Sequence, residues 1–205
     1  EAGHASISWL LEYANPLIKV TIVPRGRALG AAWYLPEERQ ITTKEQMLDE
    51  MCATLGGRAA EDLFLNRIST GAMNDLERVT KQAYGMIAYL GMSDKLPNLC
   101  YYNNEEYSFN RPYSEKTAEL IDTEVKNMVN EQYEKEKKIL SEHREGHNQL
   151  AQLLIDKEVI FAEDVERIFG KRPWASRSEE IMAAKESQEA AEAEKRLAEE
   201  VKEKE

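Results

Sequence analysis

The first four residues of the sequence place a glutamate and a histidine at a spacing suited to metal-dependent chemistry. Glu1-Ala2-Gly3-His4 matches the last four positions of the H-E-x-x-H motif, in which two histidines one helical turn apart bind zinc and the glutamate acts as general base. The first motif histidine would be the residue before Glu1. The match alone is weak support, because an ordinary i, i+3 pair on a helix surface gives the same pattern.

Asp75 is a candidate for a further metal ligand. A catalytic zinc takes three protein ligands and leaves the fourth position to water, so another part of the chain must contribute a ligand. Asp75 lies at the expected start of a helix, behind the turn-prone Ser69-Thr70-Gly71, and its carboxylate can point away from that helix. The structural alternative is an acid in the first turn that interacts with the helix dipole.

Two other histidines, His143 and His147, also lie four residues apart. Their intervening glutamate, Glu145, is one position later than in the zinc motif, and Gly146 is expected to break the turn. The surrounding stretch is strongly polar. We therefore predict a solvated surface here rather than a metal site.

Apolar periodicity and turn residues predict a mainly α fold with one small β-hairpin. Two short apolar runs, 19–23 and 31–35, are separated by a proline and a glycine and predict the two strands. Thr42 and Glu45 have capping-box spacing before one helix, and Asn74 is a suitable N-cap for the next. The predicted helices span about 1–13, 42–64, 74–90, 114–140, 150–155 and 161–169, and 91–113 is predicted to be an ordered loop.

The charge balance argues against nucleic acid as a partner. The 205 residues include 27 Lys plus Arg and 38 Asp plus Glu, for a formal net charge of -11, whereas binding to a phosphate backbone needs a basic surface. The sequence has no run approaching the roughly 20 apolar residues that cross a bilayer. We expect the chain as given to be soluble.

Cys52 and Cys100 are far apart and lie among apolar neighbours, so we predict buried thiols in a reducing compartment. The sequence begins at Glu1 without an initiator methionine. This start predicts a piece of a longer protein, from which any membrane anchor would have to come.

Five segments occur in the order and approximate spacing of the FtsH protease domain. They are Glu-Ala-Gly-His-Ala (1–5), Val-Pro-Arg-Gly-Arg-Ala-Leu-Gly (23–30), Leu-Gly-Gly-Arg-Ala-Ala-Glu (55–61), Ser-Thr-Gly-Ala-Met-Asn-Asp-Leu (69–76) and Gly-Met-Ser (91–93). The sequence thus resembles the protease domain of FtsH-type ATP-dependent zinc metalloproteases, the membrane AAA protease family, over 1–177. The acidic segment 178–205 falls outside the resemblance, and we expect a solvated helix or disorder there.

The resemblance implies roles for particular residues in a helical zinc-peptidase domain whose small β-hairpin lies near the active site. His4 and Asp75 would be zinc ligands, together with the first motif histidine that would precede Glu1. Glu1 would be the catalytic base, and Glu61 would hold a ligand in orientation. With the first histidine absent, we expect this chain to bind zinc poorly and to be inactive alone.

The strand that follows Arg25-Gly26 is expected to bind substrate. Its residues Leu29, Gly30, Ala31 and Ala32 would form an edge on which an extended chain pairs through its backbone. Such pairing reads little sequence, so the resemblance implies broad specificity.

The resemblance also implies cofactors, partners and a location for the longer protein. Besides Zn²⁺, ATP and Mg²⁺ would act only through an ATPase domain that this sequence lacks. The full-length protein would be a homo-hexamer that degrades unfolded or membrane proteins. A missing upstream anchor would hold it in the membrane, with the protease domain on the cytoplasmic face of the bacterial inner membrane or its organellar equivalent.

Two alternatives stay open at the level of sequence. One is a proteolytically inactive helical assembly module of the same fold, which a residue other than histidine before Glu1 would favour. The other is an unrelated helical peptide-binding domain, in which His4 and Asp75 would have no reason to lie close together.

We predict that the acidic tail is dispensable for stability. The segment 178–205 contains ten acidic and five basic residues and almost no large apolar side chain after Met182. Truncation after Arg177 should change the melting temperature, Tm, by no more than about one or two degrees. A larger decrease in a thermal melt would show that the tail packs on the folded domain.

Overall fold

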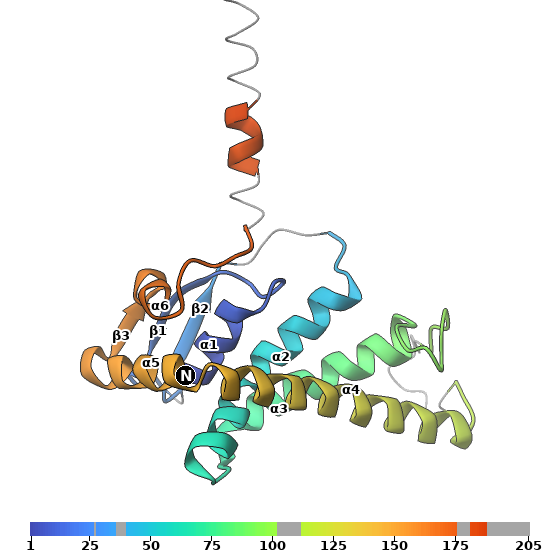
Figure 1. Ribbon diagram of the computed structural model, residues 1–205. Coiled ribbons are helices and arrows are strands. Elements are labelled where there is room, and N and C mark those ends of the chain that lie inside the picture. The colour runs from blue at the N-terminus through green and yellow to red at the C-terminus, as the bar shows by residue number, and fades with distance from the viewer. Residues whose placement is uncertain (27, 36–39, 102–111, 176–180, 188–205) are drawn as a thin grey trace, which may run out of the picture. The chain divides into compact units, whose positions relative to one another are not determined.

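The computed structural model describes residues 1–26, 28–35, 40–101, 112–175 and 181–187. Contacts divide the chain into two units, Glu1–Lys171 and Arg172–Glu205. The first unit is mainly helical and contains one small sheet, as predicted (Figure 1). In the second unit, residues 181–187 are helical and exposed. Among the described residues, no helix is long and apolar enough to cross a membrane.

Six α-helices form most of the described part of the first unit. Their bounds are α1 Ala2–Leu10, α2 Lys44–Ala60, α3 Met73–Tyr84, α4 Glu115–Glu142, α5 Arg144–Lys157 and α6 Ala162–Phe169. Two π-helical turns, η1 Glu61–Leu65 and η3 Gly85–Tyr89, continue α2 and α3, and the 3-10 turn η2 Thr70–Ala72 leads into α3. The long helix predicted over 114–140 is confirmed as α4, while α5 is longer than predicted and includes Gly146.

The helix starts differ from those predicted at two places. The capping box before α2 is formed by Thr43 and Gln46 rather than by Thr42 and Glu45. Asn74 is not an N-cap, because Ser69 already accepts a hydrogen bond from the Gly71 N–H, at 3.1 Å, to begin η2. The chain therefore enters α3 through a tight turn, with Asp75 in the first turn of the helix.

The sheet has three antiparallel strands in the order β2-β1-β3, with bounds β1 Leu17–Thr21, β2 Ala31–Tyr34 and β3 Val159–Phe161. The predicted hairpin of β1 and β2 is confirmed. β3 was not predicted, because a three-residue strand is too short to show an alternating pattern. Since β1 is central, β2 lies at an edge of the sheet.

α1 lies between two groups of elements, the sheet with α5 and α6 on one side and α2 with α3 and α4 on the other (Figure 1). Trp9 belongs to a core with Val20 of β1 and Leu150 of α5. On the opposite side, Ile7 packs with Cys52 of α2, Ala59 and Leu140. A third core lies between α2, α3 with η3, and α4, and it includes Met51, Leu55, Val79, Met86, Ile87 and Ile121.

The prediction of a solvated surface is wrong for His147. The residue is 6% exposed, its ring stacks on Phe64 with 3.9 Å between ring centroids, and burial lowers its pKa. His143 is exposed, as predicted. Gly146 does not break the helix; it lets α5 approach Phe169, whose ring would lie 2.5 Å from a Cβ at that position.

The prediction of two buried thiols is correct for Cys52 and wrong for Cys100, which is exposed. Burial raises the pKa of Cys52, so this thiol stays protonated. The described part of the predicted loop, 91–101 with 112–113, has no helix, only an isolated bridge between Met92 and Pro97. The rest of that loop, 102–111, lies outside the described residues.

We predict that Glu136→Leu stabilises the protein, and increasingly so as pH rises. Glu136 of α4 is fully buried, and neither of its carboxyl oxygens has a hydrogen-bond partner among the described residues; burial and the charge of Asp75 raise its pKa. Below the unfolded-state pKa, the Glu136 carboxyl is protonated in both the folded and the unfolded protein. At higher pH only the unfolded protein releases this proton freely, so the free energy of unfolding decreases as pH rises. Replacing this unpaired buried polar group by leucine should raise the free energy of unfolding by about 1–3 kcal/mol. Each kcal/mol corresponds to an increase in Tm of about 2–4 °C.

Thermal melts between pH 4 and pH 8 measure this effect. Glu131→Leu on the exposed face of the same helix is the matched control and should show no such pH-dependent gain. An equal gain in both variants, or a gain for Glu136→Leu that shrinks as pH rises, would contradict the assignment.

Candidate active site

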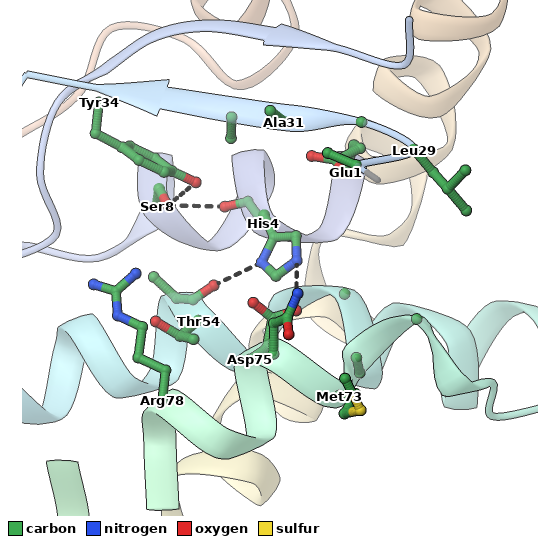
Figure 2. Close-up of a pocket in the computed structure, with 18 of the residues that line it drawn as sticks. Glu1, His4, Ser8, Leu29, Ala31, Tyr34, Thr54, Met73, Asp75 and Arg78 are labelled. Atoms are coloured by element: carbon green, nitrogen blue, oxygen red, sulfur yellow. Dashed lines mark hydrogen bonds and ion pairs between the residues drawn. The ribbon is translucent and has the colours of Figure 1, made fainter. Parts of the chain in front are cut away.

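A cleft of about 840 Å³ lies between the free edge of β2 and helices α1, α2 and α3. Figure 2 shows β2 along one wall, α1 beneath it, and α2 with α3 on the opposite wall. Its lining includes Glu1 at the N-cap of α1, His4 from α1, Asp75 from α3, and residues 28–32 at the strand. Thus segments far apart in sequence meet at one open site.

His4 presents one ring nitrogen to α2 and the other to the cleft. Its Nδ1 lies 3.1 Å from the Ala53 carbonyl oxygen. Because a carbonyl only accepts hydrogen bonds, Nδ1 must carry the proton of the neutral ring and Nε2 is left with its lone pair. A hydrogen bond of this kind is the usual way in which a metal-binding histidine is oriented.

Asp75 faces the free nitrogen of His4. Its Oδ2 lies 3.6 Å from Nε2, although 71 positions separate the two residues (Figure 2). This distance is too long for a direct hydrogen bond. It is close to the roughly 3.3 Å expected between two ligand atoms that are each about 2 Å from one tetrahedral ion.

Glu1 is the N-cap residue of α1 and lies against the start of β2. A Cβ at position 30 would be 2.6 Å from Glu1 Oε1, so the absence of a side chain at Gly30 gives this carboxylate its space. Figure 2 shows Glu1 between His4 and the strand. A carboxylate here can exchange a proton with a group bound beside His4.

The residues predicted to bind an extended substrate lie on the cleft. Ala31 and Ala32 belong to β2 and are half-buried, while Leu29 precedes the strand and is 80% exposed. Because β2 is an edge strand, its outer backbone groups face no neighbouring strand among the described residues. An extended chain could therefore pair with them.

Glu61 lines the cleft, and its carboxylate is hydrogen-bonded to the turn that leads into α3. It accepts hydrogen bonds from the backbone N–H of Ser69, at 3.0 Å, and from the Ser69 hydroxyl, while Arg58 donates to the Ser69 carbonyl at 2.9 Å. Desolvation tends to raise the pKa of Glu61, but these hydrogen bonds and the Arg58 charge lower it overall. Ser69 begins the turn that leads to Asp75, so the three-residue contact holds the start of α3.

Several polar groups of the cleft were not predicted from the sequence. Tyr34 lies near Ser8, with 3.2 Å between the two hydroxyl oxygens, and burial raises the pKa of the phenol. Strand alternation from Ala32 could have indicated that Tyr34 also faces this wall. Arg78 forms an ion pair with Glu50, and its position one turn after Asp75 was the available signal.

The donor set fits a zinc site that is short of one ligand. Among the described residues, no group of three His, Cys, Asp or Glu side chains is placed to hold a metal. His4 and Asp75 supply an imidazole nitrogen with a free lone pair and a carboxylate oxygen, both of which zinc prefers. The motif spacing predicts a further ligand at the position before Glu1.

A glutamate and a histidine on one helix that face a carboxylate from another, below a free strand edge, form the arrangement expected of a zinc-dependent peptidase. Residues 1–168 match the model of peptidase family M41. The chain therefore belongs to peptidase family M41, as the protease module of an FtsH-type zinc metalloprotease. This confirms the predicted family and removes the reading as an unrelated peptide-binding domain.

Relatives from distant organisms are similar over most of this chain. The "ATP-dependent zinc metalloprotease FtsH" of Parabacteroides distasonis is 71% identical over 188 residues, which cover 91% of this chain and 28% of that protein. The Karelsulcia muelleri protein of the same name is 52% identical over 80% of this chain and 27% of its own length. The mouse "Mitochondrial inner membrane m-AAA protease component AFG3L2" is 43% identical over 87% of this chain and 22% of its own length. The chain thus spans about a quarter of these relatives.

We predict that Glu61→Ala weakens zinc binding through the turn that it holds. Without this carboxylate, the Ser69 N–H and hydroxyl lose their acceptor, and the start of α3 is free to shift Asp75 away from His4. Loss of such a supporting contact typically costs about 10- to 100-fold in metal affinity. Zinc titration measures the effect, with Glu77→Ala on the exposed face of α3 as control. Unchanged affinity in Glu61→Ala would contradict the role.

Proposed function

We propose that this chain hydrolyses peptide bonds at the cleft, with His4 and Asp75 as zinc ligands and Glu1 as general base. The observation that carries this proposal is the 3.6 Å approach of Asp75 Oδ2 to His4 Nε2, beside Glu1. A zinc ion at such a site lowers the pKa of bound water to about 7 and polarises the scissile carbonyl.

Each residue has a distinct task in this proposal. The Ala53 carbonyl holds the His4 ring so that Nε2 points into the cleft. Glu1 takes a proton from the attacking water and delivers it to the leaving amine, which gives the product an N–H in place of the broken C–N bond. The backbone of residues 29–32 pairs with the extended substrate and sets its position over His4 and Glu1.

A histidine directly before Glu1 is the third ligand in our proposal. That position is one helical turn from His4, so its ring would lie on the same face of α1. We assign 1–177 to the peptidase domain and 178–205 to a solvated tail. Glu61 keeps its supporting role through Ser69.

For the whole protein we propose an ATP-dependent protease of unfolded or membrane proteins. Its relatives' names include "ATP-dependent", and one names the mitochondrial inner membrane. ATP and Mg²⁺ would act at an ATPase domain in the longer protein. We propose a homo-hexamer anchored in the membrane, with the peptidase domain on the cytoplasmic side in bacteria or the equivalent side in organelles.

The second candidate is an inactive assembly module of the same fold. The absence of a third metal-binding side chain among the described residues is the observation that favours it. The two candidates differ in what a single added histidine should do.

Adding one histidine before Glu1 should therefore separate them. The chain as given should bind zinc sub-stoichiometrically and fail to hydrolyse casein, whereas the extended chain should bind one zinc and become active. In the extended chain, Glu1→Gln should keep zinc while hydrolysis falls by about 10² to 10⁴.

Metal analysis and a casein assay on the same samples measure both quantities. His143→Ala in the extended chain serves as a control for an exposed histidine outside the cleft and should change neither. Stoichiometric zinc without activity would favour the assembly module. Full activity of Glu1→Gln would show that another group handles the proton.

A further inference from the structure

The backbone of Gly57 lies directly against the His4 ring. A Cβ at position 57 would be 2.7 Å from Nε2, 3.3 Å from Cε1 and 3.4 Å from Cδ2. Contacts below 3.0 Å to a Cβ are essentially never seen in proteins, so no other residue type fits while the ring keeps this position.

Ala53 and Gly57 form one surface for the ring. They are four residues apart in α2, so they lie one above the other on the same helical face. The Ala53 carbonyl contacts Nδ1 at 3.1 Å, and the bare Cα of Gly57 lies beneath the Nε2 edge. A single helical turn thus holds the imidazole at two points, one polar and one steric.

Gly56 and Gly57 serve different contacts. A Cβ at Gly56 would meet the backbone of His4 and Gly3, at 2.7 Å from His4 N and Cα, so Gly56 permits the close crossing of α1 and α2. The three atoms nearest to a Cβ at Gly57 all belong to the His4 ring. A glycine in a helix interior lowers the stability of the helix. The close crossing of α1 and α2 explains why Gly56 is nevertheless a glycine, but it does not explain Gly57.

We propose that Gly57 is a positioning residue for His4: its missing side chain sets the ring plane and keeps clear the space in front of Nε2. The metal part of this inference rests on the proposed role of His4 as a zinc ligand. The positioning part rests on the ring contacts alone.

Gly57→Ala should displace the ring without unfolding the helix. The added methyl group must push Nε2 aside, which breaks the Nδ1 contact with Ala53 and turns the lone pair away from Asp75. Alanine favours a helix more than glycine does, so α2 itself should tolerate the change. Gly85→Ala is the matched control, because in the described part of the chain a Cβ there would meet no atom within 4 Å apart from its own chain neighbours and helix backbone.

Nitrogen-15 NMR of the histidine rings, followed by zinc titration, tests the proposal on the 205-residue chain. In the original chain and in Gly85→Ala, neutral His4 should be the Nδ1–H tautomer. In Gly57→Ala it should become a mixture, and the dissociation constant for zinc at His4 should rise by about 10- to 100-fold. An unchanged tautomer and unchanged zinc affinity in Gly57→Ala would overturn the proposal.

Thermal melts in a His4→Ala background separate positioning from packing. Without the His4 ring, Gly57→Ala should leave Tm unchanged or raise it, because the clash between the added methyl group and the ring is gone. An equal decrease of Tm in both backgrounds would assign Gly57 to helix packing and overturn the proposal. If the chain extended by one histidine before Glu1 binds no zinc at His4, the proposed function fails, while the tautomer comparison still decides the role of Gly57.

Discussion

Helices α1 and α2 cross so closely that neither Gly3 nor Gly56 can carry a side chain. A Cβ at Gly3 would lie 2.1 Å from the Gly56 carbonyl oxygen. This approach brings His4 against the backbone of α2, where the Ala53 carbonyl fixes the proton on Nδ1. The free nitrogen of His4 therefore points into the cleft because two helical backbones touch.

The remaining parts of the site are brought to this crossing by separate elements. Apolar cores on both sides of α1 keep it in place, with Trp9 packed toward the sheet and Ile7 toward α2 and α4. The start of α3, which carries Asp75, is tied to α2 and η1 through the contacts of Ser69 with Arg58 and Glu61. The Asp75 side chain in the first turn of α3 therefore faces His4. Its position alone would have suggested only an interaction with the helix dipole.

The sequence predicted the elements with long apolar patterns better than those defined by single contacts. α4 was predicted within two residues at its C-terminal end because its stripe repeats over many turns. β3 was missed because Ile160 is the one buried residue in a strand of three. His147 was misjudged since its polar neighbours mask an apolar partner, Phe64, which is 83 positions away.

Within the candidate site, residue types were easier to predict than contacts. The motif and the resemblance drew attention to Glu1, His4 and Asp75, which line one cleft. They could not indicate that Glu61 acts through Ser69, or that Gly57 lies under the His4 ring, because both contacts depend on how α2 is placed relative to its neighbours. Local patterns carry little information about such distances between elements.

The most direct measurement is anomalous X-ray diffraction at the zinc edge from zinc-soaked crystals of the chain extended by one histidine before Glu1. We expect one strong peak in the cleft, about 2 Å from both His4 Nε2 and an Asp75 carboxylate oxygen. Glu1 should face the same peak without binding it. A peak elsewhere on the chain, with His4 and Asp75 uninvolved, would contradict the central claim that these two residues share a metal ion.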